Sequence, residues 1–339
     1  MIEYKEAIYK FDKKDIEKFL EKYNLTLEED VEYTIIAMDN DEIVGTGSVS
    51  GNVLKCFAVD DDYRGFGITN AIISRLLEYE YKNGRNHLFI FTKPKNSKIF
   101  ANLGFSEVAR VDDVVLFDSD IKCLYNILKK IEDKDESGVI IVNANPMTKG
   151  HLQLIEKAAS EVKKLHVFMV LEDKSDFPYE DRYNIVKEAT EHLDNVVIHR
   201  GNEYIISRAT FPTYFYKDKK IIIKSYSTLD ITIFAEYFVK ALNIKKRFVG
   251  TEVTDVVTRV YNEEMKRILP EYGVEVVEVP RFELEGNDII SATKVRKYLK
   301  EKNYDEAFKY LPEATIKYLK SDKAKESLEN LRWNIVKNK

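Results

Sequence analysis

The stretch that decides the fold of this chain is Val139-Ile-Ile-Val142, followed by Asn143-Ala-Asn145-Pro-Met-Thr148-Lys149-Gly150-His151. The first four residues form an apolar, β-branched run with the length of a buried strand. The residues from His151 onward have the apolar spacing of a helix. The polar turn between them therefore joins the end of a strand to the start of a helix, where backbone N–H groups and the helix dipole favour anions.

Residue types in this turn suit a phosphate ligand. Gly150 has no Cβ, so the backbone can come close to the ligand. Thr148 supplies a hydroxyl, and His151 can donate a hydrogen bond to an oxygen that gains charge during a reaction. Asn145 and Lys149 belong to the same turn and complete the candidate set. On the residues alone, a capping threonine with a surface histidine is the alternative interpretation.

Downstream of this turn, strand-like and helical segments alternate. Such alternation predicts a Rossmann-like α/β fold, a parallel sheet with helices on both faces and ligands at the carboxyl ends of its strands. From about Ser321 the chain becomes a lysine-rich helical tail. The expected strands are 139–142, 165–170, 196–198, 247–249 and 274–279, and the expected helices include 152–159, 181–192 and 229–242.

A second turn with phosphate-binding character stands near the C-terminus, in Asn-Asp-Ile-Ile-Ser-Ala-Thr-Lys-Val-Arg at 287–296. Ser291 and Thr293 offer hydroxyl donors at the start of a helix, while Lys294 and Arg296 offer positive charge. Taken alone, an ordinary capped helix with solvated basic residues explains it as well. Two such elements, in order on one parallel sheet, favour a nucleotide site.

Two further residues are weaker candidates. Arg182 begins the helix after the second strand and could reach the phosphates, although a solvated arginine is an equal alternative. Gly250 ends the fourth strand, where nucleotide bases commonly sit in such folds.

The first 131 residues read as mixed strand and helix, and the charged run 132–138 marks the expected boundary with a second domain, 139–339. In this first part, Tyr63-Arg64-Gly65-Phe66-Gly67-Ile68-Thr69 follows a strand and opens a helix. Arg64 and Gly67 are the candidates there for binding a pyrophosphate.

Composition narrows the class of protein. The chain has 339 residues, 44% of them hydrophobic and 33% charged, with a net charge of −5. A chain with a net negative charge is poorly suited to bind nucleic acid. No apolar stretch is long enough to cross a membrane. The two cysteines are too few for a disulfide scaffold or a zinc site. A cytoplasmic protein with no protein-bound metal is expected.

The two turns of 139–339 resemble the nucleotidyltransferase superfamily, whose hallmarks are H/T-x-G-H after the first strand and I-S-x-T-x-x-R near the end. The Tyr63–Thr69 segment resembles the R/Q-x-x-G-x-G/A turn of GNAT acetyltransferases, with Thr69 in place of the last small residue. In GNAT acetyltransferases a tyrosine usually serves as the acid that protonates the departing thiolate. Phe100 occupies that position in this chain. The resemblance therefore implies a domain able to hold a CoA-like arm but poorly equipped for acetyl transfer.

Nearly end to end, the chain resembles the citrate lyase ligase family. Besides both turns, the resemblance includes Ala-Thr-Phe-Pro-Thr-Tyr-Phe at 209–215, Gly-Thr-Glu-Val-Thr-Asp at 250–255, and Tyr261-Asn262. It implies that ATP and acetate form acetyl adenylate, and that the acetyl group passes to the thiol of a CoA-derived prosthetic group on the acyl carrier subunit of citrate lyase. Mg²⁺ is expected to be carried mainly by the phosphates.

The same resemblance assigns His151, Thr148 and Lys294 to catalysis, with the other turn residues holding the nucleotide. Three alternatives stay open on the sequence. One is an adenylyl- or cytidylyltransferase acting on a phosphorylated metabolite, with an accessory acetyltransferase-like domain. The others are a non-catalytic nucleotide-binding partner of a larger complex and a plain acetyltransferase using acetyl-CoA.

Overall fold

The structure is a computed structural model of residues 1–339, and it describes all residues except 172–174, 206–210, 216–218, 252–255, 285–287 and 334–339. The described residues form two compact units. The first unit comprises Met1–Ile127 together with Pro212–Leu229, and the second comprises Leu128–Phe211 together with Asp230–Lys339. The α/β class and the two different sheets expected from the sequence are confirmed.

The first unit is built on a seven-stranded sheet with the order β1-β2-β3-β4-β5-β7-β6. Its neighbouring strands are antiparallel except β4 and β5, which are parallel. The elements are β1 (Glu3–Glu6), α1 (Tyr9–Lys22), β2 (Tyr33–Asp39), β3 (Glu42–Ser50), β4 (Val53–Val59), α2 (Ile68–Lys82), β5 (Phe89–Thr92), α3 (Ser97–Ala101), β6 (Ser106–Arg110) and β7 (Val115–Asp118). Two helices, α4 (Lys122–Ile131) and α7 (Lys219–Ile233), begin in this unit and end in the second.

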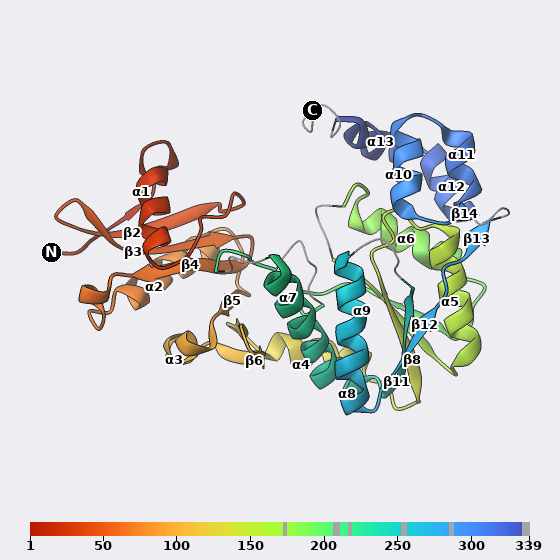
Figure 1. Cartoon of the computed structure of the whole chain (residues 1–339), viewed down its shortest axis with the longest axis horizontal. Coiled ribbons are helices and arrows are strands. Elements are labelled where there is room, and N and C mark those ends of the chain that lie inside the picture. Colours follow the sequence, from red (N-terminus) through yellow and green to blue (C-terminus); the bar gives the residue numbers. More distant parts are fainter. Residues whose placement is uncertain (172–174, 206–210, 216–218, 252–255, 285–287, 334–339) are drawn as a thin grey trace. The chain divides into compact units, whose positions relative to one another are not determined.

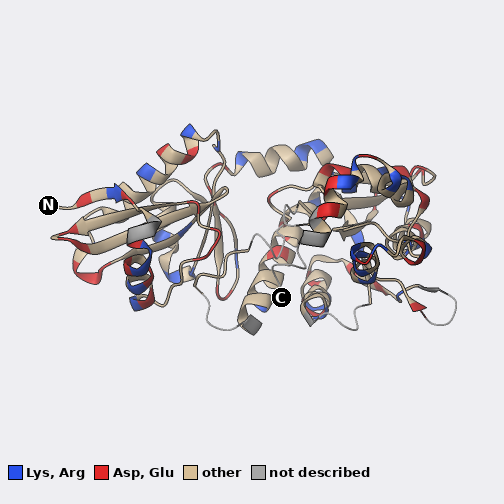
Figure 2. Ribbon diagram, turned by 90° about the horizontal axis from the view of Figure 1, so that it is seen from above, with Lys and Arg blue, Asp and Glu red and all other residues tan. Residues whose placement is uncertain are grey.

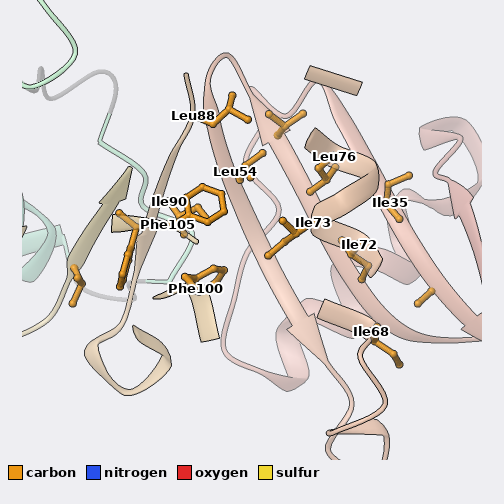
Figure 3. Close-up of a cluster of buried hydrophobic side chains, with 14 of the residues drawn as sticks. Ile35, Leu54, Ile68, Ile72, Ile73, Leu76, Leu88, Ile90, Phe100 and Phe105 are labelled. Atoms are coloured by element: carbon orange, nitrogen blue, oxygen red, sulfur yellow. The ribbon is translucent and has the colours of Figure 1, made fainter. Parts of the chain in front are cut away.

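Helix α2 holds the core of this unit together. It begins after Gly67, whose φ of 77° lies in the left-handed region that favours glycine. From there, buried apolar residues recur at helical spacing and face the sheet. They pack against strand residues such as Ile35 and Leu54, and four of them are visible in Figure 3: Ile68, Ile72, Ile73 and Leu76.

The second unit has a five-stranded sheet with the order β10-β9-β8-β11-β12, and all its strands are parallel. The chain runs outward from β8 to β9 and β10, and then returns to the other side of β8 with β11 and β12. The order therefore reverses between β8 and β11, which is where ligands bind in open α/β sheets. The strands are β8 (Ser137–Val142), β9 (Leu165–Met169), β10 (Val196–His199), β11 (Ile244–Gly250) and β12 (Glu275–Val279).

Helices cover both faces of this sheet. On one face α5 (Lys149–Glu161) and α6 (Tyr179–Ala189) bury Ile155 and Val186 against the strands. On the other face α7 continues through a π-helical turn, Phe234–Phe238, and α8 (Val239–Ala241), and Phe238 lies edge-on to Phe168 of β9. Helix α9 (Val256–Ile268) follows.

The C-terminal helices gather at one end of this unit, where they are drawn in blue (Figure 1). They share a buried apolar cluster that includes Val295, Leu299 and Leu311. The expected helical tail is thus packed onto the unit rather than fully solvated. The helices are α10 (Ala292–Lys300), α11 (Tyr304–Lys309), α12 (Glu313–Lys320) and α13 (Ala324–Trp333), and the hairpin β13 (Glu283–Leu284) and β14 (Asp288–Ile289) precedes them.

Several boundaries differ from the sequence expectation. Residues 212–229, which that expectation puts in 139–339, cluster with the first unit. The charged run 132–138 is not simply solvated, because Asp133 pairs with Lys164 at 2.5 Å and β8 already begins at Ser137. Short-range patterns cannot reveal either feature, since both depend on partners distant in sequence.

Charge and cysteine distribution agree with the composition. Basic and acidic residues are interspersed along the ribbon of each unit (Figure 2). Cys56 and Cys123 are both free thiols. In the part of the chain that the structure describes, no helix is both long and apolar enough to span a membrane.

Gly201 provides a test of the packing in the second unit. A Cβ on Gly201 would lie 2.4 Å from the Met169 carbonyl oxygen and 2.7 Å from the Leu171 backbone nitrogen. Gly201→Ala should therefore lower the free energy of unfolding by about 1–3 kcal/mol and visibly lower Tm in a thermal melt. The matched control is Gly250→Ala, because a Cβ there meets nothing within 4 Å. Equal melting of the two variants would contradict this packing.

Candidate functional site

The turn between β8 and α5 is organised by Thr148 and His151. Thr148 is the N-cap of α5, and its hydroxyl accepts a hydrogen bond from the backbone N–H of His151 at 3.4 Å. In return, the backbone N–H of Thr148 donates to Nδ1 of His151 at 3.0 Å. This reciprocal arrangement is a capping box in which histidine replaces the usual glutamate. It fixes the orientation of the imidazole at the switch point of the sheet.

The same hydrogen bond determines where His151 carries its proton. Since Nδ1 accepts from Thr148, the proton of the neutral ring resides on Nε2. The pKa of His151 is lowered from 6.5 to about 4, chiefly by burial and to a smaller extent by the positive charges of Arg281 and Arg296. At neutral pH His151 is therefore an uncharged ring whose Nδ1 is an acceptor and whose Nε2–H is a donor.

Arg296 connects the second turn to the first. Its Nη1 donates to the Asn145 carbonyl at 2.6 Å, a contact between residues 151 positions apart in the sequence. Its Nη2 donates to the Thr293 hydroxyl at 3.2 Å, and its Nε pairs with Asp176 at 3.2 Å. The two turns identified in the sequence therefore lie together in the structure.

Close packing between the turns supports this arrangement. A Cβ placed on Gly150 would stand 3.4 Å from Cγ2 of Ile290, so the backbone of the first turn approaches the residue that precedes the second helix. Ser291 is the N-cap of α10, and its hydroxyl makes no capping bond. That hydroxyl is therefore a candidate donor to a ligand, as the sequence predicts.

Lys294 lies beside an acidic partner. It forms an ion pair with Asp288, whose carboxylate also accepts a hydrogen bond from the Tyr310 hydroxyl. The bond to Asp288 raises the pKa of Lys294, and the bond to Lys294 lowers the pKa of Asp288. The ammonium group thus stays charged. To reach a phosphate it has to exchange Asp288 for that ligand.

The remaining sequence candidates occupy supporting positions. The Lys149 ammonium donates to the Lys309 carbonyl at 2.8 Å. Arg182 is fully buried, and its Nη1 donates to the Asn143 carbonyl at 2.6 Å, so it stabilises the backbone of the first turn. Gly250 ends β11 with open space where a Cβ would be. Direct contact of these three residues with a nucleotide stays a prediction.

Arg281 is a site residue that the sequence reasoning missed. It follows β12, its Nε donates to the Thr251 carbonyl at 2.9 Å, and its charge helps to lower the pKa of His151. A basic residue two positions after the last parallel strand was the available signal. No motif singles it out, because its place depends on the register between β11 and β12.

The first unit contains a cavity of about 730 Å³. The glycine-rich turn after β4 lines part of it, with Gly65 and Gly67 at φ values of 85° and 77°. Arg64 lies at this turn and pairs with Asp61 at 2.5 Å, although both side chains are largely exposed. The lining also includes aromatic and basic residues, namely Tyr23, Phe57, Tyr63, Lys93, Lys95, Phe100, Tyr214 and Phe215.

Phe100 takes the position at which the GNAT resemblance expects a tyrosine. Its side chain is only 3% exposed, and its ring lies 5.5 Å from that of Phe57. It contributes to the wall of the cavity and supplies no hydroxyl there.

Comparisons with known proteins agree with both units. The family model described as the citrate lyase ligase C-terminal domain matches residues 137–319. The model of the acetyltransferase (GNAT) domain matches residues 3–114. The chain belongs to the citrate lyase ligase family. The [citrate [pro-3S]-lyase] ligase of Klebsiella pneumoniae is 38% identical over 90% of this chain and 91% of its own length. That of Haemophilus influenzae is 39% identical over 90% of this chain and 94% of its own length.

Membership of this family makes the chain a ligase with a nucleotidyltransferase-like second unit and a GNAT-like first unit. A phosphopantetheine adenylyltransferase of Streptococcus gordonii is 45% identical over 22% of this chain and 48% of its own length. Together the ligase and adenylyltransferase relatives imply that the chain uses ATP.

Histidine titration can test the geometry at Thr148. In NMR spectra of protein with labelled histidines, the His151 ring should be the neutral Nε2–H tautomer at pH 7, with a titration midpoint at about pH 4. Assignment follows from the signal lost in His151→Gln. Because the unfolded ring titrates at about 6.5, His151 should stabilise the fold fully above that pH and progressively less down to about pH 4. A midpoint near 6.5 would contradict the description of this site.

Proposed function

We propose that the second unit joins acetate to AMP, and that the acetyl group is then passed to the thiol of a CoA-derived group on the acyl carrier subunit of citrate lyase. The observation that carries this proposal is the meeting of the two turns around His151. Together they offer a neutral N–H donor, a helix N-terminus and the basic residues Arg296 and Lys294. This combination of donors and positive charge suits a nucleoside triphosphate. The names of the relatives point to citrate lyase as the partner, and the family resemblance suggests acetate and the thiol group.

In the first step a carboxylate oxygen of acetate attacks the α-phosphorus of ATP. The new P–O bond forms as the bond to the β-phosphate oxygen breaks, and pyrophosphate leaves with its electron pair. Negative charge spreads over the phosphate oxygens on the way. Nε2–H of His151 is suited to donate to an α-phosphate oxygen there, while Thr148 orients the ring. A neutral donor gives directional stabilisation and needs no proton transfer.

The second turn fits the departing pyrophosphate. Ser291, with its hydroxyl not used in the helix cap, and Thr293 lie at the start of α10. Arg296 places its guanidinium between the turns, and Lys294 adds a second charge after release from Asp288. Among the described residues no group of three or more His, Cys, Asp or Glu side chains could hold a metal ion. We therefore assign a Mg²⁺ ion to the phosphate oxygens.

In the second step the thiol loses its proton and attacks the acetyl carbonyl. A C–S bond forms, the bond to the AMP phosphate oxygen breaks, and AMP leaves. Phe100 agrees with this direction of reaction, because a nucleophilic thiol needs no acid at that position. We assign the cavity of the first unit to the arm that carries the thiol, since its basic and aromatic lining suits a phosphate-bearing, extended chain.

Exchange of radiolabelled pyrophosphate into ATP tests the proposed reaction. The whole protein should catalyse this exchange when acetate is added and show no exchange without acetate. The adenylyltransferase relative favours one alternative, transfer of AMP to a phosphorylated metabolite. Exchange that requires 4′-phosphopantetheine instead of acetate would establish that alternative and refute the acetate reaction. Thiol acetylation by acetyl-CoA without ATP would establish a plain acetyltransferase.

His151→Ala should lower the rate of acetate-dependent exchange about 10²-fold, because one charge-stabilising donor is lost. ATP affinity, measured by calorimetry, should change much less, since the donor acts mainly on charge that develops in the transition state. His192→Ala is the matched control. That ring is exposed, follows the end of α6 and pairs with Glu156 at 2.9 Å. An unchanged exchange rate in His151→Ala would remove His151 from the mechanism.

A further inference from the structure

A threonine of the C-terminal helix α12 contacts the turn between β8 and α5. Thr315 lies near the start of α12 and is fully buried. Its hydroxyl donates to the Met147 carbonyl at 2.9 Å, although the two residues are 168 positions apart in the sequence. A threonine hydroxyl near the start of a helix usually bonds to a neighbouring backbone group or to water. The bond to a distant carbonyl therefore makes a specific link between α12 and this turn.

The carbonyl of Met147 belongs to the same peptide group that orients His151. The N–H of this peptide group is the backbone N–H of Thr148, which donates to Nδ1 of His151 at 3.0 Å. A chain of hydrogen bonds thus runs from the Thr315 hydroxyl, through one peptide group, to the imidazole. Because a peptide group is planar, a bond that fixes its carbonyl also fixes the direction of its N–H. Hydrogen bonds in such a chain also strengthen one another by polarisation.

The surroundings of Thr315 hold its hydroxyl in place. Just before α12, the Tyr310 carbonyl accepts from the backbone N–H of Lys149 at 2.8 Å, so this part of the chain contacts the turn on both sides of Thr148. Helix α12 is itself anchored at two points. Ala314 packs in the apolar cluster of the five-stranded sheet, and Leu319 packs in the cluster of the C-terminal helices. The hydroxyl is therefore presented to Met147 by a well-packed helix.

Loss of this hydroxyl would act on the imidazole in a defined way. The buried Met147 carbonyl would lose its donor, and the peptide group would be free to turn. The N–H of Thr148 would then hold Nδ1 of His151 less firmly, although the Thr148 hydroxyl, 2.9 Å from the same nitrogen, would still hold it in part. Only a ring with an unprotonated Nδ1 can accept the N–H bond. Weakening that bond therefore favours both the Nδ1–H tautomer and the charged ring.

We propose that Thr315 is a positioning residue for His151: its hydroxyl fixes the Met147–Thr148 peptide group, which keeps the imidazole oriented as an Nε2–H donor. The effect on the reaction rests on the proposed function, in which this N–H donates to an α-phosphate oxygen. The effect on the ring itself does not, and it can be measured without any substrate.

Thr315→Val tests the inference, because valine has the shape of threonine and lacks the hydroxyl. In an NMR titration with labelled histidines, the His151 midpoint should rise by about 0.5 pH unit, and the Nδ1–H tautomer should become detectable. The kcat of acetate-dependent pyrophosphate exchange should fall about tenfold, with KM for ATP changed by less than about twofold, because the donor is misplaced and not removed. Thr315→Ser keeps the hydroxyl and should stay close to the native protein in both measurements.

Thr190→Val is the matched control. Thr190 ends α6, is only 4% exposed, and its hydroxyl donates to the Val186 carbonyl at 2.8 Å. This variant should lower Tm about as much as Thr315→Val does, while the His151 midpoint and the exchange rate stay unchanged. Thr315→Ala also lacks the hydroxyl and should give the same two shifts as Thr315→Val, so it decides the question if the valine variant folds poorly.

A double-mutant cycle shows whether Thr315 acts through His151. In a His151→Ala background, Thr315→Val should lower the exchange rate by less than about twofold more, since the group that it positions is absent. A further tenfold loss in that background, an unchanged His151 midpoint in Thr315→Val, or equal shifts in Thr190→Val would each overturn the inference. Absence of acetate-dependent exchange in the native protein would refute the proposed function instead, and the titration would still decide whether Thr315 positions the ring.

Discussion

The hydrogen bond from Arg296 to the carbonyl of Asn145 is the contact on which the site of the second unit depends. It joins a turn after the first parallel strand to the start of a helix near the end of the chain. Because Arg296 also pairs with Asp176, its planar guanidinium holds three segments in one geometry. The charge that binds the turn also lowers the pKa of His151. Structural support and electrostatic tuning thus come from the same side chain.

The sequence predicted the structure of the second unit well where that structure is local. The strand, turn and helix around Thr148 and His151 are local, and so is the cap of α10 at Ser291. That His151 replaces the usual glutamate of a capping box, which fixes its tautomer, needed side-chain positions. The roles of Arg281 and Asp176 depend on strand register and on packing between distant segments, and no periodicity reports these.

Arg182 and Lys149 illustrate a second limit of sequence reasoning. A basic residue at the start of a helix looks the same in sequence whether it faces a ligand or a backbone carbonyl. In the structure Arg182 is fully buried beneath the first turn, and Lys149 donates to the carbonyl of Lys309. Buried carbonyl groups near a sharp turn need donors, and these cations supply them. The charge of such residues can still act on a nearby phosphate through the field.

The path of the chain explains why the two units are not independent pieces. Residues 212–229 leave the second unit and complete the first, where Tyr214 and Thr213 are fixed by hydrogen bonds to Phe91 and Glu28. A cut before Ser137 would leave this segment in the second fragment and remove the surface that buries it. The exposed aromatic rings would favour aggregation of that fragment. Point substitutions in the whole chain therefore test the two proposed steps more cleanly than truncation, because they keep the Tyr214 segment in its place.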